Sequence, residues 1–371
     1  MMHGNVILHP RADHQTPRRF WQGCPTIQCT PKGTLFAGWY SGGAGEPSLG
    51  NYNLLVRSRD GGLSWSDPLL VIESLREEDI LAIDIQLWMD PARRMWLFWT
   101  QRNLHFPKED PRHLELWAIV CEDPDAEILS WSEPRAIAPG FLRCRPTVLS
   151  DGRWLLCAYD WVGSRYHYSE SSDNGKTWIR KEGGEKVPTD FDESMILERN
   201  DGSLWMLARC CSGALAESVS TDGGTTWSPG RLTAIPSPNT RFFLRRLQSG
   251  RVLLIKNDNA RERIQMSAFL SEDDGKSWKY SMVVDPRETS YPDAVQGPDG
   301  TIYMVHDRGR TTFREILCSR FTEEDIIAGK LVNFDSYVCQ IISKAPATPW
   351  NADAAEAARL EDQKMRERCF S

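Results

Sequence analysis

The sequence has no long apolar run of the kind that marks a membrane-spanning segment. No stretch of the 371 residues approaches the roughly 18 apolar residues that such a helix requires. The first 17 residues carry charges and prolines, and they lack the apolar core of a signal peptide. We therefore expect no membrane partner and a cytoplasmic location for the chain as written, or a secreted or periplasmic one if the chain is truncated.

Runs of basic residues and paired metal-ligand motifs are also missing. The formal net charge is −7, and the lysines and arginines are mixed with acids rather than gathered where they would neutralise phosphates. None of the ten cysteines forms a C-x-x-C pair, and the neighbours Cys210 and Cys211 cannot bridge easily without strain. We expect reduced thiols, no metal or other cofactor, and no nucleic-acid partner.

The sequence does contain a short motif that occurs four times. The pattern S-x-D-x-G-x-x-W begins at Ser58, Ser171, Ser220 and Ser271. Its aspartate can hydrogen-bond the backbone of its own turn, its glycine permits a positive φ, and its tryptophan can anchor the following strand. A degenerate copy around Ser130-Trp131-Ser132-Glu133-Pro134 fills the long gap between the first two motifs. The pattern therefore predicts a hairpin that recurs through the chain.

A second repeat, independent of the first, gives the number of units. Six polar turns are each followed by an apolar strand, at intervals of about 50 to 60 residues. The turn positions are Gly33, Arg93, Gly152, Gly202, Gly250 and Gly300. This period suits blades of four short strands, so we predict an all-β, six-bladed β-propeller over residues 1–345. Segments 323–329 and 352–368 have helical composition, and residues 346–371 are expected to form a short helical tail outside the ring.

Residues at a fixed offset from these turns should occupy equivalent places around the propeller axis. Nine residues before each turn, the chain has Cys24, Asp84, Arg143, Glu193, Arg241 and Tyr291. Seven residues after each turn, it has Tyr40, Thr100, Tyr159, Arg209, Asn257 and Asp307. Solvation of strand ends would explain any single one of these polar residues. Two polar rings at one end of a propeller indicate instead a concave pocket with converging functional groups.

In these features the chain resembles the sialidase superfamily, also called the BNR or Asp-box family, and in particular its bacterial sialidase-like branch. The resemblance extends from about residue 25 to residue 310. Asp boxes are structural and also occur in non-catalytic carbohydrate-binding propellers, so they do not imply activity by themselves. Sialidases combine a tyrosine nucleophile and its glutamate partner with an arginine triad for the substrate carboxylate and an aspartate acid/base. The resemblance therefore implies a glycoside hydrolase that acts on a glycan.

Carried over residue by residue, the resemblance implies a role for each of four residues. The glutamate of the family matches Glu193 and its nucleophile matches Tyr291, each ahead of an Asp-Gly turn. Two of its three arginines match Arg209 and Arg263. A neutral tyrosine suits an anomeric carbon that bears a carboxylate, because the carboxylate repels an anionic nucleophile. Arginine forks bind such a carboxylate in a bidentate manner.

The chain departs from the family pattern at two positions. The first arginine of the family precedes an Ile-Pro pair, whereas Gly23 stands in that place here, with Arg18 and Arg19 as the neighbouring candidates to substitute for it. The aspartate acid/base has no clear match, so Glu46 is the first candidate proton donor and Asp84 is the second. The other ring residues expected to contribute to substrate binding are Arg143, Arg241 and Asp307.

Three functions remain open at this point. The matched residues favour an exo-glycosidase that releases a terminal acidic sugar, with sialic acid as the default. The absent arginine favours a hydrolase or lyase of the same fold that acts on rhamnose or uronic-acid glycans. The lack of a recognisable acid/base favours a non-catalytic glycan-binding propeller. Each residue also has a structural alternative, such as an ion pair between blades for an arginine or core packing for Tyr291.

Overall fold

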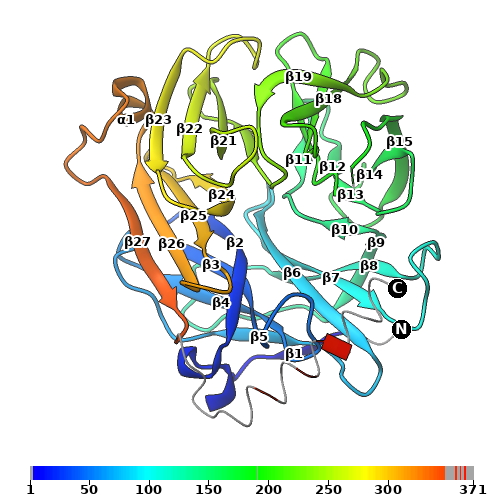
Figure 1. Cartoon of the computed structure of the whole chain (residues 1–371), viewed down its shortest axis with the longest axis vertical. Helices are drawn as coiled ribbons and strands as arrows, with labels where there is room; N and C mark the ends of the chain where they lie inside the picture. The colour runs from blue at the N-terminus through cyan, green and yellow to red at the C-terminus, as the bar shows by residue number, and fades with distance from the viewer. Residues whose placement is uncertain (1–2, 190, 347–355, 357–359, 361–362, 365–371) are drawn as a thin grey trace.

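The computed structural model describes residues 3–189, 191–346, 356, 360 and 363–364. Six antiparallel sheets of four or five strands are arranged around a central axis, and one further sheet has two strands (Figure 1). This confirms the prediction of an all-β, six-bladed propeller. Most of the tail expected at 346–371 lies outside the described residues, and so does most of the helix expected at 352–368. None of the described helices has the length and apolar character that crossing a membrane requires.

Each blade is a meander of four strands that follow one another in the chain. The first three blades consist of β2 (Trp21–Cys29), β3 (Leu35–Gly42), β4 (Tyr52–Ser58) and β5 (Leu70–Glu73); β6 (Ile80–Met89), β7 (Met95–Asn103), β8 (Leu114–Cys121) and β9 (Arg135–Pro139); and β11 (Thr147–Val148), β12 (Trp154–Leu156), β14 (Arg165–Ser171) and β15 (Ile179–Glu185). Blade 3 also carries the short pair β10 (Phe141–Leu142) and β13 (Ala158–Tyr159), and β1 (Asn5–Ile7) extends the outer edge of blade 1.

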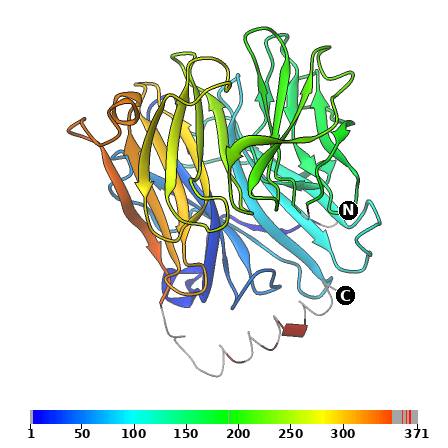
Figure 2. The ribbon, with the colours of Figure 1, turned by 45° about the horizontal axis from the view of Figure 1, so that its top comes forward.

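The last three blades have the same order of strands. They consist of β16 (Met195–Glu198), β17 (Leu204–Ala208), β18 (Ala214–Ser220) and β19 (Arg231–Pro236); β20 (Phe243–Arg246), β21 (Val252–Asn257), β22 (Met266–Ser271) and β23 (Tyr280–Asp285); and β24 (Ser290–Gln296), β25 (Ile302–Arg308), β26 (Glu315–Phe321) and β27 (Tyr337–Lys344). The first strands of blades 6, 1 and 2 contact one another in turn, and so do those of blades 4, 5 and 6, so these strands lie nearest the axis. Figure 2 shows blade 1 in blue beside blade 6 in orange, where β2 packs against β24 and β25 to close the ring.

Each of the four Asp boxes lies in the turn between the third and fourth strands of a blade, which is the recurring hairpin that the motif predicts. In blade 3, Asp173 accepts a hydrogen bond from the backbone N–H of Thr177 at 2.9 Å. Gly175 has a φ of +80°, and the indole N–H of Trp178 donates to the Gly175 carbonyl at 3.2 Å. The degenerate copy at Trp131 lies in the corresponding turn of blade 2, between β8 and β9.

Blade 6 has a helix in place of the Asp box. The predicted helix at 323–329 is present as α1 (Glu323–Ala328), between β26 and β27. Thr322 caps its first turn by accepting from the N–H of Asp325 at 3.3 Å, and Asp325 accepts in return from the N–H of Thr322 at 2.8 Å. Gly329 ends the helix in the left-handed region, with φ of +70°. The chain then returns as β27 to complete the sixth sheet.

Candidate functional site

The first strands of several blades carry a backbone irregularity at the positions of the first predicted ring. Cys24, Asp84, Glu193 and Tyr291 have positive φ values of 57°, 54°, 39° and 54°. Three of them lie in β-bulges of β2, β6 and β24, where the strand has one more residue than its neighbour. Bulges re-aim side chains, and left-handed backbone at residues other than glycine gathers at functional sites. This repeated device explains why a fixed offset from the turns identifies residues that meet near the axis.

A cavity of about 550 Å³ contains seven of the nine predicted site residues, namely Glu46, Asp84, Arg143, Glu193, Arg209, Arg263 and Tyr291. The lining has six basic side chains, because Arg102, Lys108 and Arg310 join the three predicted arginines, and it has three acids. Its aromatic residues include Phe141, Tyr159, Trp161 and Phe191. A larger hollow of about 690 Å³, beside Asp299 and Glu323, is lined mainly by polar residues and has no aromatic residue in its wall.

Tyr291 and Glu193 form the closest match to the predicted chemistry. The Tyr291 hydroxyl donates to Oε1 of Glu193 at 2.9 Å, and both side chains are buried. Arg209 Nη1 donates to the same hydroxyl at 3.0 Å and lies 2.9 Å from Oε2 of Glu193. The phenol, the carboxylate and the guanidinium therefore form one compact, charge-assisted network.

The network sets the protonation of its members. Burial and the charge of Glu193 raise the pKa of Tyr291 to about 12, although nearby arginines oppose the shift. Burial alone would raise the pKa of Glu193, but Arg209 and Arg143 outweigh it and lower that pKa below its usual value. At neutral pH the pair is therefore a neutral phenol against a charged carboxylate, which is the arrangement of a nucleophile and its general base.

Arg209 and Arg263 are held side by side by one residue, Asn239. Nε of Arg209 donates to the Asn239 side-chain oxygen at 2.7 Å, and Nη2 of Arg263 donates to the Asn239 carbonyl at 2.8 Å. The Cζ atom of Arg263 lies 5.9 Å from the centroid of the Tyr291 ring. Two guanidinium groups therefore face the cavity next to the phenol, where they can receive a carboxylate.

Both candidate proton donors lie together on another part of the wall. Asp84 pairs with Nη1 of Arg143 at 2.5 Å, and Glu46 pairs with Nη1 of Arg310 at 2.8 Å. Carboxylate oxygens of the two acids and the Cys24 sulfur all lie within 4.8 Å of one another. Burial raises the pKa of Asp84 to about 6, against the opposing effect of Arg143. Asp84 therefore retains a proton to higher pH than an ordinary aspartate does.

Two predicted residues, Arg241 and Asp307, are not among those that line the cavity, and their contact with a substrate remains a prediction. Arg241 donates to Asp293 at 3.3 Å and is 1% exposed. Asp307 accepts from the N–H of Cys24 at 2.8 Å and from the Ser290 hydroxyl at 2.6 Å. Both are committed to buried partners, because an unpaired charge at these depths would be costly.

The neighbours Arg18 and Arg19, considered as substitutes for the absent arginine, also lie outside the lining of the cavity. Arg19 is 1% exposed, and its guanidinium donates to the His14 carbonyl at 2.8 Å and to the Ser343 hydroxyl at 3.2 Å. Of the three basic lining residues that sequence reasoning missed, Arg310 has its guanidinium carbon 4.0 Å from the centroid of the Tyr291 ring. It lies beyond the end of β25, three residues after a ring position, so no strand register applies to it.

Two clusters in the described part of the chain contain three potential metal ligands. In the first, Cys24, Glu46 and Asp84 lie against Arg143 and Arg310, whose charges disfavour a cation. Both carboxylates already have a cationic partner. This cluster is therefore better suited to proton transfer than to metal binding.

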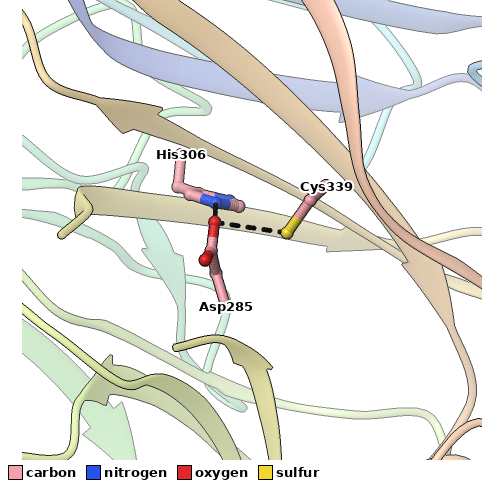
Figure 3. A group of neighbouring side chains, drawn as sticks. All are labelled: Asp285, His306 and Cys339. Carbon is pink, nitrogen blue, oxygen red and sulfur yellow. Dashed lines mark hydrogen bonds and ion pairs between the residues drawn. The ribbon is translucent and has the colours of Figure 1, made fainter. Parts of the chain in front are cut away.

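The second cluster joins blades 5 and 6 and is shown in Figure 3. Asp285 Oδ2 lies 3.1 Å from Nε2 of His306 and accepts from the Cys339 thiol at 3.2 Å. Arg287 donates two hydrogen bonds to the same carboxylate, of 2.8 and 2.7 Å. Burial and the charge of Asp285 raise the pKa of the Cys339 thiol to about 12, so the thiol stays protonated. This carboxylate is already neutralised, and the cluster is a hydrogen-bonded contact between blades. The absence of a cofactor remains a prediction.

Comparison with known proteins identifies a family and related folds. Residues 33–304 match the family described as "BNR repeat-like domain". The chain is 27% identical over 324 residues to a sialidase of Micromonospora viridifaciens, covering 77% of this chain and 49% of the relative. It is 26% identical over 209 residues to an anhydrosialidase of Macrobdella decora, covering 50% of this chain and 27% of the relative. The chain thus spans half or less of the length of these curated relatives.

Among solved structures, the intramolecular trans-sialidase from Ruminococcus gnavus has a similar fold. It superposes with a TM-score of 0.69 at 16% identity, and the match covers 87% of this chain and 98% of that one. The NanB sialidase from Streptococcus pneumoniae gives a TM-score of 0.64 at 14% identity, with 91% and 70% coverage. These similarities confirm the resemblance in fold to the sialidase superfamily.

Proposed function

Because the chain belongs to the family of the BNR repeat-like domain, we propose that it is a sialidase-like glycoside hydrolase that releases a terminal acidic sugar, with sialic acid as the first candidate. One observation carries this proposal. The Tyr291 hydroxyl lies 2.9 Å from Glu193, in a cavity whose basic side chains outnumber its acids. A phenol paired with a carboxylate beside two arginines has the parts needed to attack an anomeric carbon that bears a carboxylate.

In the proposed first step, the oxygen of Tyr291 attacks the anomeric carbon while its proton passes to Glu193. Asp84 or Glu46 donates a proton to the glycosidic oxygen, so the aglycone leaves as a neutral alcohol and the sugar remains bonded to the tyrosine. Arg209 stabilises the developing phenolate charge, since its Nη1 lies 3.0 Å from the hydroxyl oxygen.

In the proposed second step, water attacks the anomeric carbon as the same acid, now ionised, takes a proton from that water. The bond to the tyrosine breaks, and Glu193 returns its proton to the phenolate. Two successive displacements give net retention at the anomeric carbon. Asp84 suits this double role because burial raises its pKa to about 6, near the pH at which both protonation states are accessible.

A second candidate is a hydrolase or lyase of the same fold for a rhamnose or uronic-acid glycan. The observation that favours it is Gly23, which stands where sialidases have an arginine. A uronic acid carries its carboxylate away from the anomeric carbon and would need a different placement of cations.

The proposed function is tested by hydrolysis of a panel of aryl glycosides carrying sialic acid, glucuronic acid and rhamnose. We expect release from the sialoside, with the first-formed sugar retaining its anomeric configuration by NMR. A fluorinated sialosyl fluoride should trap the intermediate and add the mass of the sugar to the peptide that contains Tyr291. Turnover of the rhamnoside or glucuronide with no turnover of the sialoside would replace the first candidate by the second.

A further inference from the structure

Gly23 and Arg310 compete for the same space. An ideal Cβ atom on Gly23 would lie 2.9 Å from both Cδ and Nε of Arg310 and 3.0 Å from its Cγ. These separations are below van der Waals contact, so the stem of Arg310 fills the volume into which any side chain at position 23 would project. The φ of Gly23 is not positive, so the local backbone does not itself demand glycine. Glycine is required here by the neighbouring arginine.

Arg310 is held in place by a buried carboxylate. Its Nε donates to Oδ2 of Asp307 at 2.9 Å, and Asp307 is 1% exposed. Asp307 is itself fixed by the N–H of Cys24 at 2.8 Å and by the Ser290 hydroxyl at 2.6 Å. Blades 1 and 6 therefore jointly fix this arginine. Such support is typical of a side chain whose position must be accurate.

The far end of Arg310 faces the cavity beside the proposed nucleophile. Its Cζ lies 4.0 Å from the centroid of the Tyr291 ring, and its Nη1 lies 2.8 Å from Glu46. Its Nη2 is buried and makes no hydrogen bond to any residue in the described part of the chain. One nitrogen of the Arg310 guanidinium is therefore still available to bind a substrate. It lies near Tyr291, the same residue that Arg209 and Arg263 approach.

We propose that Arg310 supplies, from the turn after β25, the third arginine of the substrate-carboxylate clamp in place of the residue absent at position 23. This inference rests on the proposed function, because it names a residue that binds the same substrate. The other basic ring residues fit the role less well. Arg241 does not line the cavity and is paired with Asp293. Arg143 lines the cavity, but its side chain is only 3% exposed, against 16% for that of Arg310.

The first test compares an aryl sialoside with its methyl ester, which has the same sugar without the negative charge. Arg310→Ala should raise KM for the sialoside at least about tenfold, while KM for the ester changes less than about threefold. Arg308→Ala is a matched control, because Arg308 and Arg310 have equally exposed side chains (16%) and lie in the same turn region. Arg308 pairs with Glu315 and does not line the cavity, so KM should not change.

The second test moves the arginine back to position 23. In the double variant Gly23→Arg/Arg310→Ala, the obstructing stem is gone, and KM for the sialoside should return to within about threefold of the original value. Gly23→Arg alone should lower the free energy of unfolding in urea, because the new side chain would overlap with the stem of Arg310. Circular dichroism and urea midpoints establish that the variants used for kinetics are folded.

The outcomes separate this inference from the proposed function. In one outcome, the original protein hydrolyses the sialoside, and Arg263→Ala impairs this hydrolysis but Arg310→Ala does not. The assignment of Arg310 to the clamp is then wrong, and the proposed function stands. An equal effect of Arg310→Ala on sialoside and ester also overturns the assignment. Suppose instead that the original protein neither hydrolyses the sialoside nor binds free N-acetylneuraminic acid in calorimetry; the proposed function then fails first.

Discussion

Replacement of Tyr291 by phenylalanine tests the proposed nucleophile with little change in packing. The ring is 8% exposed, and the guanidinium carbons of Arg310 and Arg143 lie 4.0 and 4.5 Å from its centroid. Phenylalanine keeps these contacts and removes only the hydroxyl, with its hydrogen bonds to Glu193 and Arg209. Those two partners remain an ion pair at 2.9 Å, but Oε1 of Glu193 loses the hydrogen bond from the hydroxyl. The loss of stability should therefore be about 1–3 kcal/mol, the cost of leaving a buried acceptor without its donor.

The kinetic loss should be much larger. With a pKa of about 12, the Tyr291 phenol would ionise unaided in only about one molecule in 10⁵ at pH 7, which corresponds to about 7 kcal/mol. Transfer of the proton to Glu193 during attack avoids most of this cost in the original protein. Phenylalanine has no nucleophilic oxygen, so kcat should fall at least about 10³-fold while the affinity for a sialic acid analogue changes less than about threefold.

Initial rates on an aryl sialoside give kcat, and calorimetry with the sialic acid analogue gives the binding affinity separately. Tyr166→Phe is the matched control, since Tyr166 is fully buried in blade 3 outside the cavity and its hydroxyl accepts one long bond, of 3.4 Å, from the N–H of Val187. It should leave kcat and binding unchanged. Equal losses of turnover and binding in Tyr291→Phe would refute the nucleophile assignment and indicate that the hydroxyl positions the ligand.

Three further predictions follow from the same contacts. Burial raises the pKa of Asp84 to about 6, so if Asp84 is the proton donor kcat/KM should fall as pH rises through about 6, and Asp84→Asn should abolish that limb of the pH–rate profile. Arg263→Ala should raise KM for the sialoside about tenfold and should change kcat less than threefold. The reason is that Arg263 lines the cavity but makes no hydrogen bond to Glu193 or to the Tyr291 hydroxyl. Gly175→Ala should lower the free energy of unfolding more than Gly202→Ala: their φ values are +80° and +81°, but an added Cβ would lie 2.7 Å from a tryptophan ring only in the first. In urea titration, the free energy of unfolding should fall by about 1–2 kcal/mol for Gly202→Ala and by about 1–3 kcal/mol more than that for Gly175→Ala. Equal losses in the two variants would contradict the packing argument.

The blade count and part of the site were predictable because both depend on repetition. Each Asp box marks the same turn in its blade. Each polar turn fixes the positions of equivalent residues along the first strand of its blade. Asp84, Arg143, Glu193 and Tyr291 line one cavity because their blades share this register. The bulges that present three of the ring residues were not predictable, since neighbouring polar residues give no sign of an extra residue in a strand.

Register predicts where a residue lies, but not which partner binds its side chain. Arg241 occupies a ring position, yet it pairs with Asp293, a buried acid that also holds Arg145 at 2.8 Å. Asp307 likewise lies at a ring position, but it orients Arg310 from behind. Both outcomes depend on contacts between blades far apart in the sequence, for which a repeat pattern contains no information.

Closure of the ring explains how a residue missing from blade 1 can be replaced from blade 6. The first strand β2 packs directly against β24 and β25, so Gly23 and Arg310 are neighbours although nearly the whole chain separates them in sequence. A side chain near the axis can therefore be contributed by either blade without any change in the sheets. The three acids of the cavity are each matched by an arginine, as Glu193 by Arg209, Asp84 by Arg143 and Glu46 by Arg310. The charge at such a site is set by all the blades together, so the loss of one family residue does not by itself predict loss of affinity for an anion.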